Sequence, residues 1–168
     1  SNFTGVVEVI DAIGTIKMML DVHPKTKKIL IINDYLKTGL AWQKTIQDDL
    51  KKENLEVDIL FSPNVPLKEL KAQIDSLSSD TLVLLGVYFS DKNGHYLTYE
   101  TIAPLLLDDS PVPVYNLLEF NTRGKVIGGK VISGYHQAKL MSEIANEVLA
   151  GKKPQDIPVL VKETSTLV

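Results

Sequence analysis

The strongest constraint on the fold is an alternation of two hydrophobic patterns along the chain. Continuous apolar runs occur at residues 28–33 (KILIIN), 57–61 (VDILF) and 81–89 (TLVLLGVYF). Between them, apolar residues recur every three or four positions, as they do on one face of a helix. A continuous apolar run predicts a strand that is buried on both faces of a parallel sheet. The alternation therefore predicts right-handed strand–helix–strand units around such a sheet.

End signals and shorter apolar runs complete the predicted elements. Helical periodicity marks Val9 to Leu20, residues 39–53, Leu67 to Leu77, residues 99–108, and a last segment that includes Met141 to Leu149. Pro24 ends the first helix, Thr98 is the expected N-cap of the fourth, and Gly151 ends the last. Shorter strands are predicted at residues 111–116 (PVPVYN), at 125–132 (KVIGGKVI) and, as an edge strand, at 157–161 (IPVLV).

These patterns predict an α/β fold of three layers, with a doubly wound, mainly parallel sheet and helices on both faces. With 168 residues, 44% of them hydrophobic and 23% charged, the chain is long enough for one domain with a sizeable core. We therefore expect residues 1–168 to form a single domain whose core spans about residues 3–161. Because the ordered pattern begins directly after Ser1-Asn2, we also expect the domain to be part of a longer protein.

Composition excludes several classes of function. The net charge is −3 and the basic residues are scattered, so the chain lacks the basic face that a nucleic-acid partner requires. The absence of cysteine excludes disulfides, thiol catalysis and thiolate metal sites. No apolar segment approaches the roughly 20 residues of a membrane-spanning helix, and no signal peptide is evident.

Motifs for catalysis and cofactor binding are also missing. The IIND stretch at residues 31–34 is typical of a receiver domain, but the third predicted strand is followed by no aspartate before Asp91. The glycine pair at 128–129 lies in an apparent strand, where close backbone packing or a bulge explains it better than a dinucleotide site does. The three histidines accompany neither a nucleophile elbow nor clustered metal ligands. We therefore expect no cofactor and no metal, and enzymatic activity has no support.

Candidate binding residues follow the ends of the predicted strands, where ligands bind in parallel α/β sheets. The loops at residues 33–38, 62–64, 88–96 and 115–121 combine aromatic rings with amide, hydroxyl and acidic groups, as small-molecule pockets do. The candidate ligand-binding residues are Asn33, Asp34, Tyr35, Tyr88, Ser90, Asp91, Tyr115, Asn116 and Glu119. For each of them a structural role stays open, in turns, caps or half-buried strand ends. Asn93-Gly94 in particular predicts a tight turn.

The order of several stretches resembles a known family. The stretches are TGVVEVIDAIGTIKMMLDVHPKTKKILIINDY, SDKNGHYLT, PVPVYN and IGGKVISGYHQAKLMSEIANEVLAGKKPQDIPV, over about residues 3–161. They resemble the substrate-binding components of ABC transporters, which have the type I periplasmic-binding-protein fold. More closely, they are similar to the branch that forms extracytoplasmic sensor regions of bacterial histidine kinases and diguanylate cyclases.

The resemblance implies a clamshell of two α/β lobes with a small organic ligand between them. This chain resembles the second lobe plus a return segment, so it implies a first lobe of the same protein before Phe3. The family's ligand-facing loops correspond to Asn33–Tyr35, Tyr88–Asp91 and Tyr115–Glu119. Relatives bind amino acids and similar molecules, and the tyrosines would suit an aromatic or amphipathic ligand.

We therefore expect a non-enzymatic, ligand-binding sensor domain of a membrane-bound bacterial signal-transduction protein. Its place would be the periplasmic side, with the inner membrane reached only through the parent protein. A substrate-binding component of an ABC transporter is the first alternative, and a small α/β enzyme with an unrecognised site is the second. A homodimer is compatible with a sensor, although the sequence shows no interface signature. The ligand and the output domain stay open.

Overall fold

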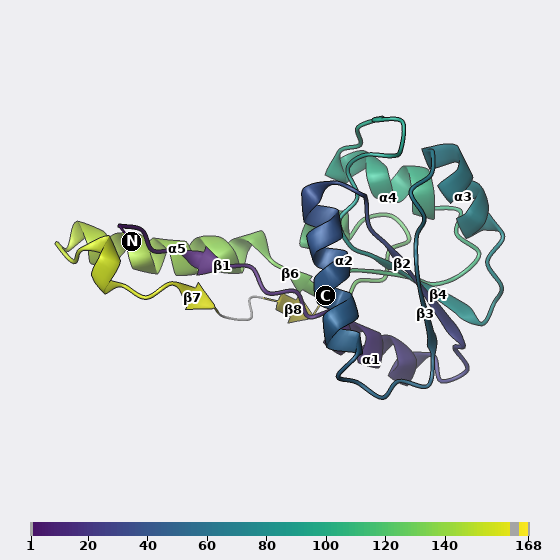
Figure 1. Ribbon diagram of the computed structural model, residues 1–168, viewed down its shortest axis with the longest axis horizontal. Helices are drawn as coiled ribbons and strands as arrows, with labels where there is room; N and C mark the ends of the chain where they lie inside the picture. The colour runs from purple at the N-terminus through teal and green to yellow at the C-terminus, as the bar shows by residue number, and fades with distance from the viewer. Residues whose placement is uncertain (1, 162–164, 168) are drawn as a thin grey trace.

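A four-stranded parallel sheet lies at the centre of the structure, a computed structural model that describes residues 2–161 and 165–167. Its strands, in spatial order, are β3 (Asp58–Phe61), β2 (Lys28–Ile32), β4 (Thr81–Leu85) and β5 (Val114–Asn116). One face of the sheet packs against α1 (Ala12–Val22) and α2 (Lys37–Leu50), and the other packs against α3 (Leu67–Asp75) and α4 (Tyr99–Leu107) (Figure 1). These elements form the body of the molecule, and they confirm the predicted three-layer α/β fold.

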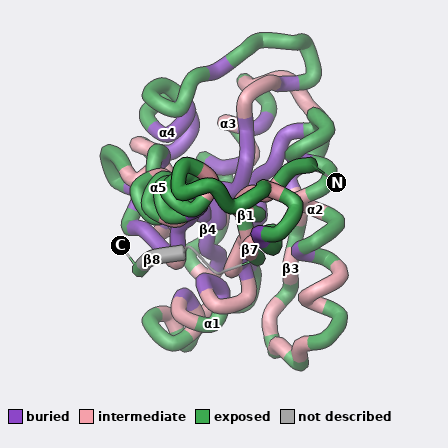
Figure 2. Tube along the Cα trace, turned by 90° about the vertical axis from the view of Figure 1, so that its left-hand side faces the viewer, coloured by how far each residue is buried: buried purple, intermediate pink, exposed green. Residues whose placement is uncertain are grey.

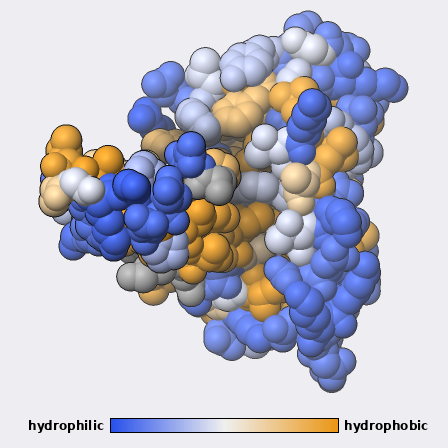
Figure 3. Space-filling model, turned by 60° about the vertical axis from the view of Figure 1, so that its left-hand side comes forward, coloured by the Kyte–Doolittle hydropathy of each residue, from blue (hydrophilic) through white to orange (hydrophobic). Residues whose placement is uncertain are grey.

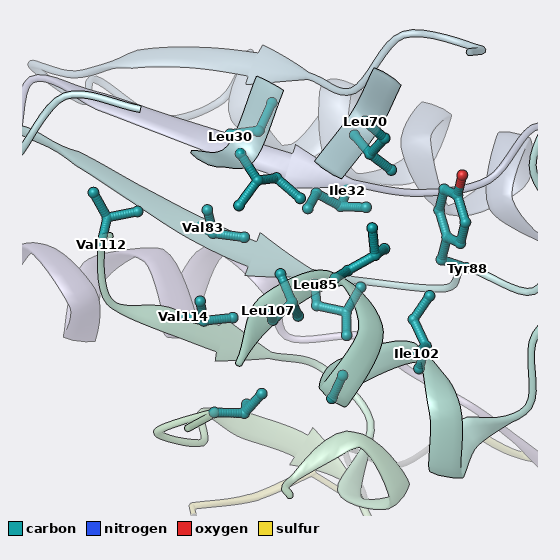
Figure 4. Close-up of a cluster of buried hydrophobic side chains, with 14 of the residues drawn as sticks. Leu30, Ile32, Leu70, Val83, Leu85, Tyr88, Ile102, Leu107, Val112 and Val114 are labelled. Atoms are coloured by element: carbon teal, nitrogen blue, oxygen red, sulfur yellow. The ribbon is translucent and has the colours of Figure 1, made fainter. Parts of the chain in front are cut away.

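The central strand β2 explains why the apolar runs are continuous. Leu30 and Ile32 pack into a hydrophobic cluster with α3 and α4 (Figure 4), whereas Ile29 and Ile31 pack into a second cluster with α1 and α2. None of these four side chains is more than 1% exposed. Because successive side chains of a strand point to opposite faces, both faces need apolar residues when both are covered.

The helix starts follow local hydrogen bonding. The first helix begins at Ala12 rather than near Val9, because the Asp11 carboxylate accepts a 2.7 Å hydrogen bond from the backbone N–H of Gly14. An aspartate that bonds a first-turn N–H in this way sets the helix start. Thr98 precedes α4 as predicted, and its backbone N–H donates to the hydroxyl of Thr101 at 3.0 Å.

The predicted strand at residues 125–132 is shorter in the structure. Only β6 (Lys130–Ile132) is a strand, and it pairs antiparallel with β8 (Ser165–Leu167). Gly129 has a φ of +156°, and a Cβ there would collide with the carbonyl oxygen of Asn116. The glycine pair thus allows a close approach of two backbones, as the structural explanation predicted. Between β5 and β6 the chain also forms the short 3₁₀ helix η1 (Glu119–Asn121).

The last helix, α5 (Gly134–Leu149), leaves the body instead of covering the sheet (Figure 1). Together with β1 (Val6–Val7), η2 (Pro154–Asp156) and β7 (Leu160–Val161), it forms a projection that we call the arm. The predicted strand at 157–161 therefore lies in the arm, where β7 pairs in parallel with β1. Most of the arm is exposed (Figure 2). Neither α5 nor another helix among the described residues is both long and apolar enough to cross a membrane.

An ion pair ties the base of the arm to the body. The Lys130 ammonium lies 2.6 Å from the Asp11 carboxylate, and the backbone N–H of Lys130 donates to the Thr15 hydroxyl at 3.1 Å. Asp11 stands where the chain passes from the arm into α1, and Lys130 stands in the strand that leads back into α5. These contacts hold together two segments that run between the arm and the body, the one that leads into α1 and the one that leads into α5.

Candidate ligand-binding site

The carboxyl ends of the strands lie on the side of the body from which the arm projects. An isolated bridge between Leu118 and Ile132 is parallel, so β6 runs in the same direction as β5 before it leads into α5. The loops that follow β2, β3, β4 and β5 therefore surround the base of the arm. We call this side of the body the carboxyl edge.

Asn33 and Asp34 connect two loops of the carboxyl edge. The Oδ1 atom of Asn33 accepts a 3.0 Å hydrogen bond from the backbone N–H of Val87. The Asp34 carboxylate accepts hydrogen bonds from the backbone N–H groups of Phe89 (2.7 Å) and Leu36 (3.1 Å). Burial raises the pKa of Asp34, and these backbone donors oppose the rise. Asn33 and Asp34 are 2% and 1% exposed, so they hold the loops of the carboxyl edge in place from within the protein.

Asp91 organises the turn that follows β4. Its carboxylate accepts hydrogen bonds from the backbone N–H groups of Leu67 (2.9 Å), Asn93 (2.8 Å) and His95 (2.9 Å), and its Oδ2 atom lies 3.0 Å from Nδ1 of His95. Burial alone would raise the pKa of Asp91, but these hydrogen bonds hold it well below its usual range. Asp91 therefore fixes the Asn93-Gly94 turn and the start of α3.

A small pocket opens between the loops after β2, β3 and β4. Its volume is about 130 Å³. It is lined by Tyr35, Leu36, Asn64, Ser90, Asp91 and Lys92. We call it the carboxyl-edge pocket, and it brings together three of the predicted site residues, Tyr35, Ser90 and Asp91.

Two groups of the carboxyl-edge pocket are already oriented by the fold. The Tyr35 hydroxyl donates to the carbonyl of Ser62 at 3.0 Å, and the Ser90 hydroxyl donates to the carbonyl of Asp91 at 3.3 Å. Lys92 differs from them, because its exposed ammonium forms no ion pair within the described part of the chain. The pocket therefore offers a free cation beside fixed hydroxyl groups.

Tyr88 lies beneath the carboxyl edge. It is 5% exposed and packs in the cluster of α3 and α4, near Leu70 and Ile102 (Figure 4). Burial, with a smaller effect of the Asp91 and Asp34 carboxylates, raises the pKa of Tyr88 to about 12. The structure thus places this ring in the core rather than in the pocket.

The predicted residues after β5 do not reach the pocket either. The ring of Tyr115 packs with α1 and α2, and its hydroxyl lies 2.9 Å from Nε2 of His23. Asn116 is fully buried, and its Nδ2 atom donates to the carbonyl of Leu118 (2.8 Å) and to the hydroxyl of Thr122 (3.0 Å). Glu119 is exposed at the start of η1.

Four aromatic rings form a continuous series at the carboxyl edge, which we call the aromatic ladder. Its members in order are Tyr96, Phe89, Tyr99 and Phe120. The ring of Phe89 stacks on Tyr96 with centroids 6.0 Å apart and meets Tyr99 edge-on at 4.8 Å, and Tyr99 lies 4.9 Å from Phe120. Tyr96, Tyr99 and Phe120 are 71%, 37% and 45% exposed. Such rings offer apolar contact area to an aromatic or apolar partner.

These rings are not among the binding residues predicted from the sequence, although Phe89, Tyr96 and Phe120 lie in the loops predicted to form the site. A clue was available, because aromatic residues recur at 88, 89, 96 and 99 directly after a predicted buried strand. The arm approaches the same rings. Burial, together with the nearby Glu8 carboxylate of the arm, raises the pKa of Tyr99.

A larger pocket lies at the opposite end of the sheet. It has a volume of about 270 Å³ and includes His23, Lys25, Leu82 and Pro113. Leu82 and Pro113 stand at the amino ends of β4 and β5, so we call it the amino-edge pocket. Ligands of parallel α/β sheets bind beyond the carboxyl ends of the strands. We therefore assign the candidate site to the smaller pocket and the ladder beside it.

The groups at the carboxyl edge are suited to binding rather than to metal chemistry. Among the described residues, no three His, Asp or Glu side chains are grouped so that they could hold a metal ion. The edge carries exposed aromatic rings, carboxylates that are engaged by backbone N–H groups, and the Lys92 ammonium. This arrangement can hold an organic molecule by ring contact and charge.

Comparison of the fold with solved structures gives three similar proteins. A substrate-binding protein with adhesive properties from Clostridium difficile, in a ligand-free, open structure, is 14% identical with a TM-score of 0.70. A conserved domain protein from Vibrio cholerae O1 biovar El Tor is 13% identical with a TM-score of 0.66. An ABC domain in complex with L-Trp from Streptococcus pneumoniae is 18% identical with a TM-score of 0.64.

The fold is periplasmic-binding-protein-like. Each comparison covers 98% of this chain but only 54–55% of the similar protein, so the chain spans about half the length of these structures. At these identities the likeness shows the fold alone. No protein-family model and no curated protein matches the sequence.

Proposed function

We propose that this chain is one lobe of a two-lobe, non-enzymatic protein that binds a small organic ligand at the carboxyl edge. The observation that carries the proposal is the arm, which projects from the side of the body that holds the pocket and the aromatic ladder. The similar structures are about twice as long as this chain. A first lobe of the same protein would pack against the arm and face the carboxyl edge, with the ligand between the lobes.

The surface of α5 supports a covering partner. One apolar stripe, Leu140, Ile144 and Val148, is buried or half-buried within the arm. A second stripe at helical spacing is exposed and consists of Tyr135, Ala138, Met141, Ala145 and Leu149. Tyr135 is 72% exposed and Leu149 is 84% exposed. A contiguous apolar stripe on a surface marks an interaction site, and a first lobe is the partner that the arm geometry favours.

An aromatic or amino-acid-like ligand fits the surface between arm and body. Hydrophobic side chains gather where the arm leaves the body and on the body beside it (Figure 3). The ladder residues supply rings there, and the carboxyl-edge pocket supplies Tyr35, Ser90 and Lys92. One similar structure, the ABC domain from Streptococcus pneumoniae, contains L-Trp, which supports a ligand of this class.

Two lobes also give a physical route from binding to signal. A single lobe supplies only part of the contacts with the ligand, so it should bind weakly by itself. In a two-lobe protein, closure around the ligand would bend the segments that connect the lobes. Asp11 and Lys130 join two such segments at the base of the arm. They would keep the crossing segments together while the lobes move.

The sequence resemblance favours an extracytoplasmic sensor domain of a histidine kinase or diguanylate cyclase, tethered to the inner membrane by its parent protein. Two of the similar structures are described as a substrate-binding protein and an ABC domain. These descriptions favour the second candidate, a substrate-binding component of an ABC transporter. The residues that follow Val168 in the encoded protein decide between them. A membrane span followed by a kinase or cyclase supports the sensor, and a stop codon supports the transporter component.

A thermal-shift screen of the longest protein that contains this chain tests the proposed function. Amino acids and small organic acids are added over a range of concentrations, because a ligand of the native state raises the unfolding midpoint by mass action. We expect a concentration-dependent rise with at least one compound, which Tyr35→Ala weakens. Turnover of the compound that is lost on replacement of Asp91 or Glu119 would instead support a small α/β enzyme and contradict the proposal.

A further inference from the structure

The carboxyl-edge pocket and the aromatic ladder share one loop. Phe89 belongs to the ladder, and the next residues, Ser90 to Lys92, line the pocket. The loop then returns, so that Tyr96 forms a bridge with Ser90 and stacks on Phe89. A molecule that fills the pocket and extends from it therefore meets the rings of the ladder.

The charged groups in and behind the pocket differ in whether they are already paired within the protein. Asp91 lines the pocket, but its carboxylate accepts hydrogen bonds from three backbone N–H groups and contacts Nδ1 of His95. Its side chain is only 1% exposed. Asp34 lies behind Phe89 with both carboxylate oxygens bonded to backbone N–H groups. Lys92 is exposed and forms no ion pair with any described residue. The pocket thus has an available cation and no available anion.

Two carboxylates lie near the far end of the ladder. The Glu8 carboxylate is close enough to Tyr99 to contribute to its raised pKa, and the exposed Glu119 directly precedes Phe120. A negatively charged group of a ligand is therefore attracted toward Lys92 and repelled from the Tyr99 end. This asymmetry gives an anionic aromatic molecule one preferred direction along the ladder.

On the basis of the proposed function, we propose that the ligand is an aromatic carboxylate, with its ring on the aromatic ladder and its carboxylate paired with Lys92. The lobe described here recognises the ring and the acid, and the one carboxylate that lines its pocket, Asp91, is engaged by backbone N–H groups and His95 rather than free to pair with an ammonium group. Aromatic acids without an amino group are therefore sufficient ligands for this surface.

Three probes of similar size separate these features. Phenylpropionate has a ring and an acid, phenethylamine has the ring and an amine, and cyclohexylpropionate has the acid and a saturated ring. Titration calorimetry of the longest protein that contains this chain should give about tenfold tighter binding of phenylpropionate than of phenethylamine, since a hydrogen bond to a charged group is lost. Cyclohexylpropionate should bind about fivefold more weakly than phenylpropionate, because ring–ring contact is lost.

Matched variants locate the two contacts. Lys92→Met should weaken phenylpropionate binding about tenfold, whereas Lys25→Met, which removes the same charge at the amino-edge pocket, should leave it unchanged. Tyr96→Leu should reduce the preference for the phenyl over the cyclohexyl probe, and Tyr96→Phe, which keeps the ring, should retain it. The three side chains altered in these variants are exposed, so circular dichroism should show unchanged folding.

The outcomes distinguish this inference from the proposed function. Tighter binding of phenethylamine, equal affinity for the phenyl and cyclohexyl probes, or loss of binding in Lys25→Met instead of Lys92→Met would overturn the aromatic-carboxylate assignment while ligand binding itself stands. Absence of binding by these probes and by every compound of the amino-acid and organic-acid screen would instead overturn the proposed function.

Discussion

The backbone N–H of Phe89 donates a 2.7 Å hydrogen bond to the Oδ2 atom of Asp34. This bond joins the loop after β2 to the loop after β4, and it holds the second ring of the aromatic ladder above the sheet. The other carboxylate oxygen accepts a hydrogen bond from the N–H of Leu36, and Leu36 lines the carboxyl-edge pocket. Asp34 therefore positions both parts of the candidate site without being exposed to the ligand.

Replacement of Asp34 tests this positioning role. Asp34→Ala leaves two backbone N–H groups without their acceptor, and we expect a loss of about 3 kcal/mol in the free energy of unfolding. Asp34→Asn keeps one carbonyl oxygen and should lose about half as much. Urea denaturation measures both values. Equal stability of the alanine variant and the unaltered protein would show that the two loops do not depend on this carboxylate.

The pKa of Asp91 predicts a dependence of stability on pH. Because hydrogen bonds hold this pKa below that of the unfolded chain, ionised Asp91 stabilises the fold above about pH 4. The contribution is lost as the pH falls through the lower pKa of the folded state. Asp91→Asn should therefore be less stable than the unaltered protein at neutral pH, and the difference should shrink below about pH 4. Chemical denaturation at a series of pH values checks this, and a constant difference at every pH would contradict it.

The buried strands predict where core mutations are costly. Ile31 of β2 is 0% exposed, so Ile31→Ala should cost about 3 kcal/mol through lost contacts and a cavity. Leu60 of β3 is 45% exposed, and Leu60→Ala should cost less than about 1 kcal/mol. Urea midpoints of the two variants give the comparison. Similar losses for both would mean that the edge strand is covered in solution.

The sheet and its carboxyl edge are predictable from the sequence because strands buried on both faces need continuous apolar runs. The run at Ile29 to Ile32 leads directly to Asn33 and Asp34, and the parallel arrangement brings that loop beside the one at Phe89. Side-chain direction is harder to predict. Tyr115 follows Val114 in β5, so its ring points to the opposite face and meets His23. Its hydroxyl is therefore engaged at the amino side of the sheet.

The structure of the arm could not be predicted from the local hydrophobic pattern alone. Met141, Ile144, Val148 and Leu149 form one broad apolar face in the sequence, but the structure divides it into a stripe that packs within the arm and a stripe that is exposed. Which stripe is covered depends on the partner, and periodicity contains no information on the partner. For the same reason, pairing of β7 with β1 across most of the chain length is not visible in the residues of either strand.

The exposed stripe of α5 gives a test of the first lobe. Met141 is 45% exposed, so Met141→Lys should leave the stability of this chain by itself unchanged within about 0.5 kcal/mol. In the longest protein that contains the chain, the same variant should lower the unfolding midpoint, because a charge would be buried against the first lobe. Lys139→Met on the same helix adds an apolar side chain and serves as the control. An unchanged midpoint of Met141→Lys in the longer protein would mean that another surface covers the first lobe.

The most direct test of ligand binding at the carboxyl edge is nuclear magnetic resonance titration of the ¹⁵N-labelled chain with phenylpropionate. Binding to a single lobe should be weak, yet amide shifts report it residue by residue. If the ligand binds at the carboxyl edge, the largest changes should occur at residues 34–36, 89–99 and 119–121, around the carboxyl-edge pocket and the aromatic ladder. Changes confined to residues 22–26 and 79–82, around the amino-edge pocket, would contradict it.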